Sequence, residues 1–159
     1  MSRRLRIAFL AVVAAQLLFP LAVIGYNELK LATGQEVRLH VQPVDPTDFF
    51  RGEYVALSYD ISRIDTKGEP PGTTVYVPLR KTGGRWTGAF ASSQRPPENV
   101  TFIRGHATES GIEFGIETYF VEEGQARKYE QAVGRGDLFV DVVLDDDGGA
   151  KIKRLRVIP

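Results

Sequence analysis

Cysteine is absent from this chain of 159 residues, which has one methionine, at position 1, and two histidines. Without cysteine the chain has no disulfide, thiol nucleophile or cysteine-ligated metal, and an oxidising compartment presents no thiol problem. His40 and His106 lie too far apart in the sequence for the spacing of a zinc site, and no Gly-x-Ser-x-Gly motif accompanies them. We therefore expect no metal, no cofactor and no serine–histidine catalysis.

Excess charge of one sign is also lacking, because 20 basic residues balance 20 acidic residues. Arg3, Arg4 and Arg6 precede a long apolar run, and removing these three leaves 17 basic against 20 acidic residues, a net charge of −3. A mildly acidic domain is a poor match for a polyphosphate backbone. We therefore expect no nucleic-acid partner.

The apolar run is the first feature that is present. From Ile7 to Tyr26 the sequence is IAFLAVVAAQLLFPLAVIGY, in which Gln16 is the only strongly polar residue. Twenty helical residues extend for about 30 Å, the thickness of a bilayer core. The run exceeds the 7–15 apolar residues typical of a signal peptide and lacks a convincing cleavage site, which favours an uncleaved anchor over a signal peptide or a buried helix.

The arginines before the run predict a cytoplasmic N-terminus by the positive-inside rule. We expect residues 1–34 to form the cytoplasmic terminus and a single transmembrane helix in the cytoplasmic (inner) membrane, in contact with the lipid bilayer. Residues 35–159 are then an extracytoplasmic, periplasmic domain.

Alternating apolar and polar residues predict β-strands in most of this domain. In 53–61 the alternation places Leu57 and Tyr59 on the core face and Tyr54 on the other face. The remaining strands are predicted at 36–42, 74–80, 85–90, 100–107 and 111–120, with a last hairpin around DDGG at 146–149 and one short helix within 121–133. The expected fold is mostly β: a single antiparallel β-barrel or sandwich of about eight strands.

A polar cluster precedes the strand that begins near residue 53, in the stretch PVDPTDFFRGEYVALSY (43–59). Asp45 and Asp48 suit a turn and a helical cap, Gly52 suits a positive φ, and alternation places Glu53 on the core face with Arg51 as a nearby donor. The cluster has three interpretations: a structural turn, a binding site for an anionic or polyhydroxylated ligand, or a site of acid/base chemistry.

A second carboxylate lies in the predicted strand 111–120. Alternation places Glu117 and Tyr119 on one face and Ile116, Thr118 and Phe120 on the other. Glu53 and Glu117 are candidates for the two carboxylates of a glycan hydrolase, whereas the structural alternative for Glu117 is an ion pair with Arg51 or Arg104.

The segment GEYVALSY fits the pattern Gly-acid-Tyr-x-x-Leu-x-Tyr. Together with PVDPTDFFRG before it and FGIETYFVEEG at 114–124, it resembles the GDYXXLXY family of uncharacterised bacterial membrane-anchored proteins, although Glu53 replaces the aspartate of the family name. The resemblance implies one N-terminal membrane segment and a β-rich domain, and a multi-pass integral-membrane protein as partner. It implies no established activity.

Three functional hypotheses follow. The leading one is a non-catalytic accessory subunit of an integral-membrane partner, with Gln16 and small residues at 8, 11, 14, 15 and 22 as a packing face of the helix. The others are a small-ligand or envelope-glycan binding module, built on the loop from Asp45 to Arg51 with Tyr54 and Tyr119, and a carboxylate hydrolase. The candidate binding or structural residues are Asp45, Asp48, Arg51, Gly52, Glu53, Tyr54, Leu57, Tyr59, Glu117 and Tyr119.

Overall fold

A computed structural model describes residues 3–42, 54–122 and 124–158 of the chain. By their contacts the residues form two compact units, Met1–Thr33 and Gly34–Pro159. We refer to the second as the β unit and describe each unit by itself.

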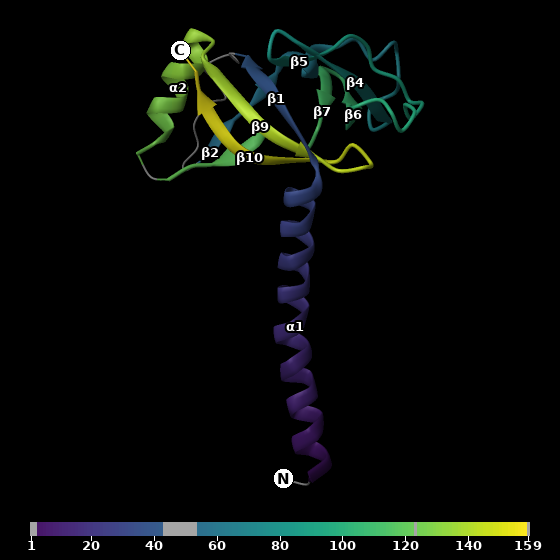
Figure 1. The fold of residues 1–159 in the computed structure, drawn as a ribbon, viewed down its shortest axis with the longest axis vertical. Coiled ribbons are helices and arrows are strands. Elements are labelled where there is room, and N and C mark those ends of the chain that lie inside the picture. The colour runs from purple at the N-terminus through teal and green to yellow at the C-terminus, as the bar shows by residue number, and fades with distance from the viewer. Residues whose placement is uncertain (1–2, 43–53, 123, 159) are drawn as a thin grey trace. The chain divides into compact units, whose positions relative to one another are not determined.

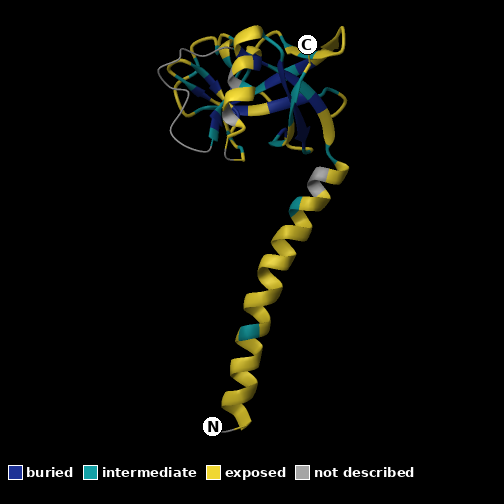
Figure 2. Cartoon of the chain, turned by 90° about the vertical axis from the view of Figure 1, so that its left-hand side faces the viewer, coloured by how far each residue is buried: buried dark blue, intermediate teal, exposed yellow. Residues whose placement is uncertain are grey.

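The first unit is one helix, α1 (Arg3–Thr33), with Pro20 inside it. Its segment Arg3–Leu29 contains an 18-residue window with a mean hydropathy of 2.6, and none of that window is buried. Figure 2 shows exposed residues along almost the whole helix. Large apolar side chains such as Leu18 and Phe19 are among the exposed residues of the chain. Leaving each such side chain in water, and not in an apolar surrounding, costs about 1.5–3 kcal/mol. The helix is long and apolar enough to span a membrane.

The β unit is built from antiparallel strands that curl into a half-barrel (Figure 1). One sheet has the order β10-β9-β1-β3, a second β2-β8, and a third β5-β4-β6-β7. The strands are β1 (Gln35–Gln42), β2 (Tyr54–Ala56), β3 (Ser58–Tyr59), β4 (Thr74–Thr82), β5 (Arg85–Gly88), β6 (Phe102–Thr108), β7 (Gly111–Glu113), β8 (Thr118–Phe120), β9 (Leu138–Leu144) and β10 (Ala150–Val157). A 3₁₀ helix, η2 (Asp60–Arg63), and one α-helix, α2 (Ala126–Arg135), complete the described elements. The predicted mostly β class is confirmed.

The core lies where the alternation predicts it. Inward positions of β1, β2–β3, β4 and β9 are almost completely buried, and they belong to one cluster: Val37, Leu39, Val41, Val55, Leu57, Tyr59, Val75, Val77, Leu138, Val140 and Val142. The predicted hairpin at 146–149 is also confirmed, since β9 and β10 pair directly. The Asp145 carboxylate stabilises its turn by accepting the N–H groups of Asp147 and Gly149.

Two predicted strands are wrong as single elements. The segment 53–61 is divided at Leu57 into β2 and β3 and then continues as η2. The segment 111–120 is divided into β7 and β8 by a turn in which Gly115 has a φ of +78°. Because β7 pairs with β6 and β8 pairs with β2, the two halves belong to different sheets.

This division also changes the expected faces. Ile116 is buried in the turn before β8, whereas Thr118 and Phe120 are exposed, so these three residues do not share one face. The helix α2 lies within and just beyond the predicted range and begins after Gly124, whose φ of +81° is unfavourable for helix.

Candidate functional site

Leu57 and Tyr59, in the described part of the GEYVALSY segment, form hydrogen bonds to the turn between β7 and β8. The Tyr59 side chain is fully buried, and its hydroxyl donates a hydrogen bond of 2.6 Å to the carbonyl oxygen of Ile116. The N–H of Leu57 donates to the carbonyl oxygen of Glu117 at 2.7 Å. These two bonds join strands β2 and β3 to a turn that follows about 60 residues later in the chain.

Burial, and next the nearby charge of Glu117, raises the pKa of the Tyr59 hydroxyl well above its ordinary value. The hydroxyl therefore stays protonated and remains a hydrogen-bond donor at every physiological pH. Its role in this arrangement is structural.

Glu117 belongs to the same turn. Its Oε1 accepts the N–H of Phe114 at 2.6 Å, which closes the turn from within. Among the described residues Glu117 forms no ion pair with Arg104, and the alternative partner, Arg51, lies outside them. A local backbone bond satisfies the carboxylate instead, as acidic side chains commonly do in turns.

Tyr54 and Tyr119 lie on neighbouring strands but on opposite faces. Tyr54 is directly opposite Phe120, and their rings form an edge-to-face pair with centroids 6.1 Å apart. Tyr119 is opposite Val55 and packs against the core. The two tyrosines therefore lie on different faces, because side chains on a two-stranded sheet alternate between its faces.

Five expected site residues, Asp45, Asp48, Arg51, Gly52 and Glu53, lie outside the described residues. The expected Glu53–Glu117 carboxylate pair and the Arg51 contacts are accordingly not tested.

A polar cleft of about 300 Å³ adjoins the β7–β8 turn. Its polar lining residues are Ser58, Ser62, Arg63, Thr108, Ser110, Glu113 and Glu117. The Ser62 hydroxyl oxygen is buried and has no hydrogen-bond partner among the described residues. Glu117 thus lies at the edge of a cleft whose lining is mostly polar.

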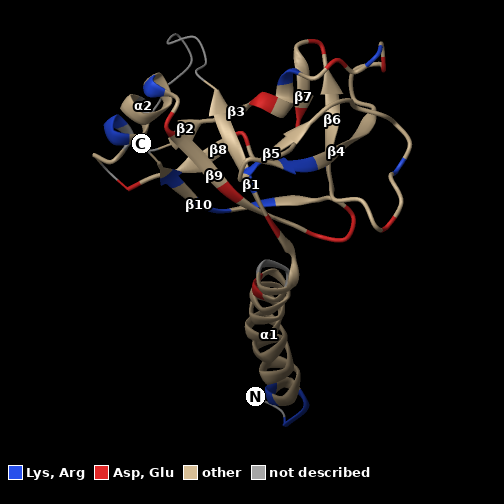
Figure 3. Cartoon of the chain, turned by 45° about the horizontal axis from the view of Figure 1, so that its top comes forward, with Lys and Arg blue, Asp and Glu red and all other residues tan. Residues whose placement is uncertain are grey.

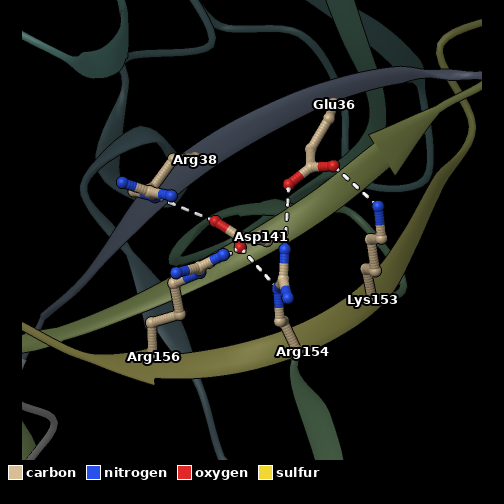
Figure 4. Close-up of polar contacts among 6 residues, drawn as sticks. All are labelled: Glu36, Arg38, Asp141, Lys153, Arg154 and Arg156. Carbon is tan, nitrogen blue, oxygen red and sulfur yellow. Dashed lines mark hydrogen bonds and ion pairs between the residues drawn. The ribbon is translucent and has the colours of Figure 1, made fainter.

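The most highly charged cluster lies elsewhere, on β9. Both faces of this strand are buried: one faces the core, and the outer face carries Phe139, Asp141 and Val143. The strand register places Asp141 between Arg38 of β1 and Arg154 of β10. Figure 4 shows that these two side chains and Arg156 converge on the carboxylate.

Asp141 accepts three hydrogen bonds from these arginines. The Nε atoms of Arg38, Arg154 and Arg156 lie 2.8, 2.9 and 2.5 Å from its oxygens, and Asp141 is only 1% exposed. Burial raises the pKa of this carboxyl, but the three guanidinium hydrogen bonds together outweigh it and hold the pKa at about 2. Asp141 is therefore ionised at neutral pH.

Glu36 extends the network at the surface. It accepts a hydrogen bond from Lys153 Nζ at 2.7 Å, which lowers its pKa, and it lies 3.7 Å from an amino group of Arg154. Several cationic side chains thus lie on the outer face of this sheet, and Figure 3 shows basic segments along β10.

Two sequence signals point to this cluster, which our sequence interpretation missed. One is a lone aspartate in the apolar stretch LFVDVVL, because a buried carboxylate requires donors. The other is the spacing of the apolar residues Ile152 and Leu155 in the last strand. They are three positions apart, whereas residues on one face of a regular strand are two or four positions apart. The register shifts between Ile152 and Arg154, and this irregularity turns Arg154 and Arg156 to the outer face.

Comparisons with known proteins give one match. A family model described as GDYXXLXY protein matches residues 16–155. No curated protein and no solved structure matches the chain.

Proposed function

The chain belongs to the GDYXXLXY family, and from this premise we propose that it is a single-pass membrane protein whose β unit acts, without catalysis of its own, as an accessory subunit of an integral-membrane partner. The observation that carries the proposal is α1: its segment Arg3–Leu29 has 27 residues and contains an apolar 18-residue window of which none is buried. At about 1.5 Å per residue it extends for about 40 Å, enough for a bilayer core and part of both interfaces.

The roles of the family motif support a non-catalytic function. Leu57 and Tyr59, the last two specified positions of the motif, connect the strands to the β7–β8 turn. A buried tyrosine that donates to a main-chain carbonyl maintains the fold and offers no reactive group to a substrate. Folding thus explains part of the family motif. We assign recognition of the partner to the surfaces of the helix and the β unit.

For the orientation we propose a cytoplasmic N-terminus and an extracytoplasmic β unit in the inner membrane, because Arg3, Arg4 and Arg6 precede the apolar segment. Protease added to intact spheroplasts that contain the full chain should degrade the β unit and leave a fragment of the helix. A cytoplasmic protein followed in the same sample is the control and should survive until the cells are lysed. Protection of the β unit until lysis would contradict the orientation.

The helix offers a face for a partner. Ala8, Ala11, Ala15 and Ala22 recur at intervals of three, four and seven residues, which places them on one side of an α-helix. Small residues allow close approach of a second helix in lipid, where van der Waals packing drives association. The chain connects the helix to the sheet through Gly34 alone, because α1 ends at Thr33 and β1 begins at Gln35. Such a short connection favours a partner that lies in the membrane or at its surface.

The decisive experiment purifies the full-length protein from its native membrane in mild detergent and identifies the companions by mass spectrometry. We expect a stoichiometric multi-pass protein. Ala15→Leu with Ala22→Leu should reduce its recovery about tenfold or more, since the added side chains block helix contact. Val13→Leu, which adds bulk on the opposite side of the helix, is the matched control and should leave recovery unchanged.

Two results would contradict the accessory role. One is a wild-type protein that is recovered alone at unit stoichiometry. The other is a companion whose recovery is the same for the variant with both Ala15→Leu and Ala22→Leu as for wild type, and which is also not lost when the β unit is removed.

A further inference from the structure

A second cleft lies on the outer side of the sheet that contains the Asp141 cluster. It has a volume of about 310 Å³ and is bordered by β1, the β4–β5 turn, the end of α2 and the residues after β10. Among its lining residues are Arg38, Arg85, Asp137 and Phe139. The volume is at the lower end of the range for small-molecule sites, about 300–1,000 Å³.

An aromatic floor positions one of the two arginines. The Phe139 ring is nearly buried, and the guanidinium carbon of Arg85 lies 5.1 Å from its centroid. His40 packs on the same ring at 5.1 Å. A guanidinium group that stacks on a ring keeps its N–H groups in its own plane, where they remain available to an acceptor.

The Asp141 carboxylate positions the other arginine. It binds Arg38 only through Nε, and 35% of the Arg38 side chain is exposed. Figure 4 shows one end of the guanidinium group pointing away from Asp141. Within the described part of the chain no acceptor occupies the terminal amino groups of Arg38. The buried carboxylate thus orients a cation toward the cleft.

The charges around the cleft do not balance. Six positive side chains on or beside this face accompany three carboxylates, Asp141, Glu36 and Asp137: Arg38, Arg85, Arg135, Lys153, Arg154 and Arg156. Asp137, at the rim of the cleft, is paired with Arg135 at 2.9 Å. Arg38, Arg154 and Arg156 already neutralise Asp141. Arg85 is not needed for this, and it has no acidic partner among the residues that the structure describes. This excess of positive charge stands out in a chain that is net acidic after its N-terminal arginines.

We propose that the cleft between Arg38 and Arg85 binds the phosphate group of an anionic ligand. Two guanidinium forks on one cleft match the several oxygens and the double charge of a phosphate better than the single charge of a carboxylate. The cleft is larger than a phosphate ion, and the Phe139 floor offers an apolar surface to the organic part of the ligand. The phosphate belongs either to a soluble phosphoester or to the headgroup of an anionic lipid.

Titration calorimetry of the full-length protein with inorganic phosphate in maltoside micelles, which carry no phosphate, tests the site. Arg85→Gln should weaken binding about tenfold or more. Lys81→Gln removes the same charge from the other face of the same hairpin and should change the affinity less than about twofold. Arg85→Lys keeps the charge without the fork and should give an intermediate loss. Thermal midpoints of the three variants show whether each is folded.

The same titration in lipid discs distinguishes the two sources. If the ligand is a lipid headgroup, discs that contain phosphatidylglycerol should weaken the binding of soluble phosphate to the wild type, whereas a soluble ligand predicts equal affinity in discs and micelles. The proposal is overturned if wild type shows no saturable phosphate binding at constant ionic strength, or if folded Arg85→Gln and Lys81→Gln bind phosphate as wild type does.

Discussion

Replacing Asp141 with asparagine should lower the free energy of unfolding by about 3 kcal/mol, because three guanidinium groups then share a site with no negative charge. Removing one partner of a buried ion pair costs about 3–5 kcal/mol, and the lower value applies because the arginines reach solvent. Denaturant unfolding of the full-length protein in detergent, followed through the single tryptophan, Trp86, measures the change.

Glu36→Gln is the matched control. It removes a carboxylate from the same network, but Glu36 is exposed, and we expect a loss below about 1 kcal/mol. Equal losses in the two variants would show that burial of Asp141 does not matter.

The dependence on pH gives a second test of Asp141. The folded pKa is depressed from the ordinary 3.8 to about 2, so the stabilisation is fully present above about pH 4 and is lost as pH falls through 2. The difference in stability between wild type and Asp141→Asn should therefore be constant near neutral pH and shrink toward pH 2. A difference independent of pH over this range would contradict an ionised Asp141.

Replacing Tyr59 with alanine should lower the free energy of unfolding by about 4 kcal/mol. A large core side chain cut to alanine costs about 3–5 kcal/mol, and the variant also leaves the Ile116 carbonyl oxygen without its donor. Tyr59→Phe removes only the hydroxyl and should cost about 1–2 kcal/mol. The same unfolding measurement separates the two contributions.

Tyr54→Phe is the control for the hydroxyl. Tyr54 belongs to the same motif, but it is partly exposed and makes a ring contact with Phe120. We expect a change below about 0.5 kcal/mol. If Tyr59→Phe were as stable as wild type, the buried hydrogen bond would not explain this position of the motif.

Local pattern predicted most of the β unit. Val37, Leu39 and Val41 lie in the core because alternate residues of a strand point to the same side wherever the strand pairs. The segment 111–120 is the exception. The alternation in this segment is compatible with one strand. However, the chain turns at Gly115, and the two halves of the segment pair with strands of two different sheets.

The candidate site was predicted less well. Leu57, Tyr59 and Glu117 do lie together, and their hydrogen bonds stabilise the β7–β8 turn. The binding-module hypothesis groups Tyr54 with Tyr119, and the β2–β8 register assigns these two residues to opposite faces.

By itself the sequence determined the apolar helix, the mostly β class, the inward faces of the long strands and the family, because each depends on residues that are neighbours in the chain. Only the tertiary structure decided which strands share a sheet and which charges meet. Asp141 and Arg38 are 103 residues apart, and no local period relates them. Their contact depends on the register of β1 against β9, which is set by the packing of the whole core.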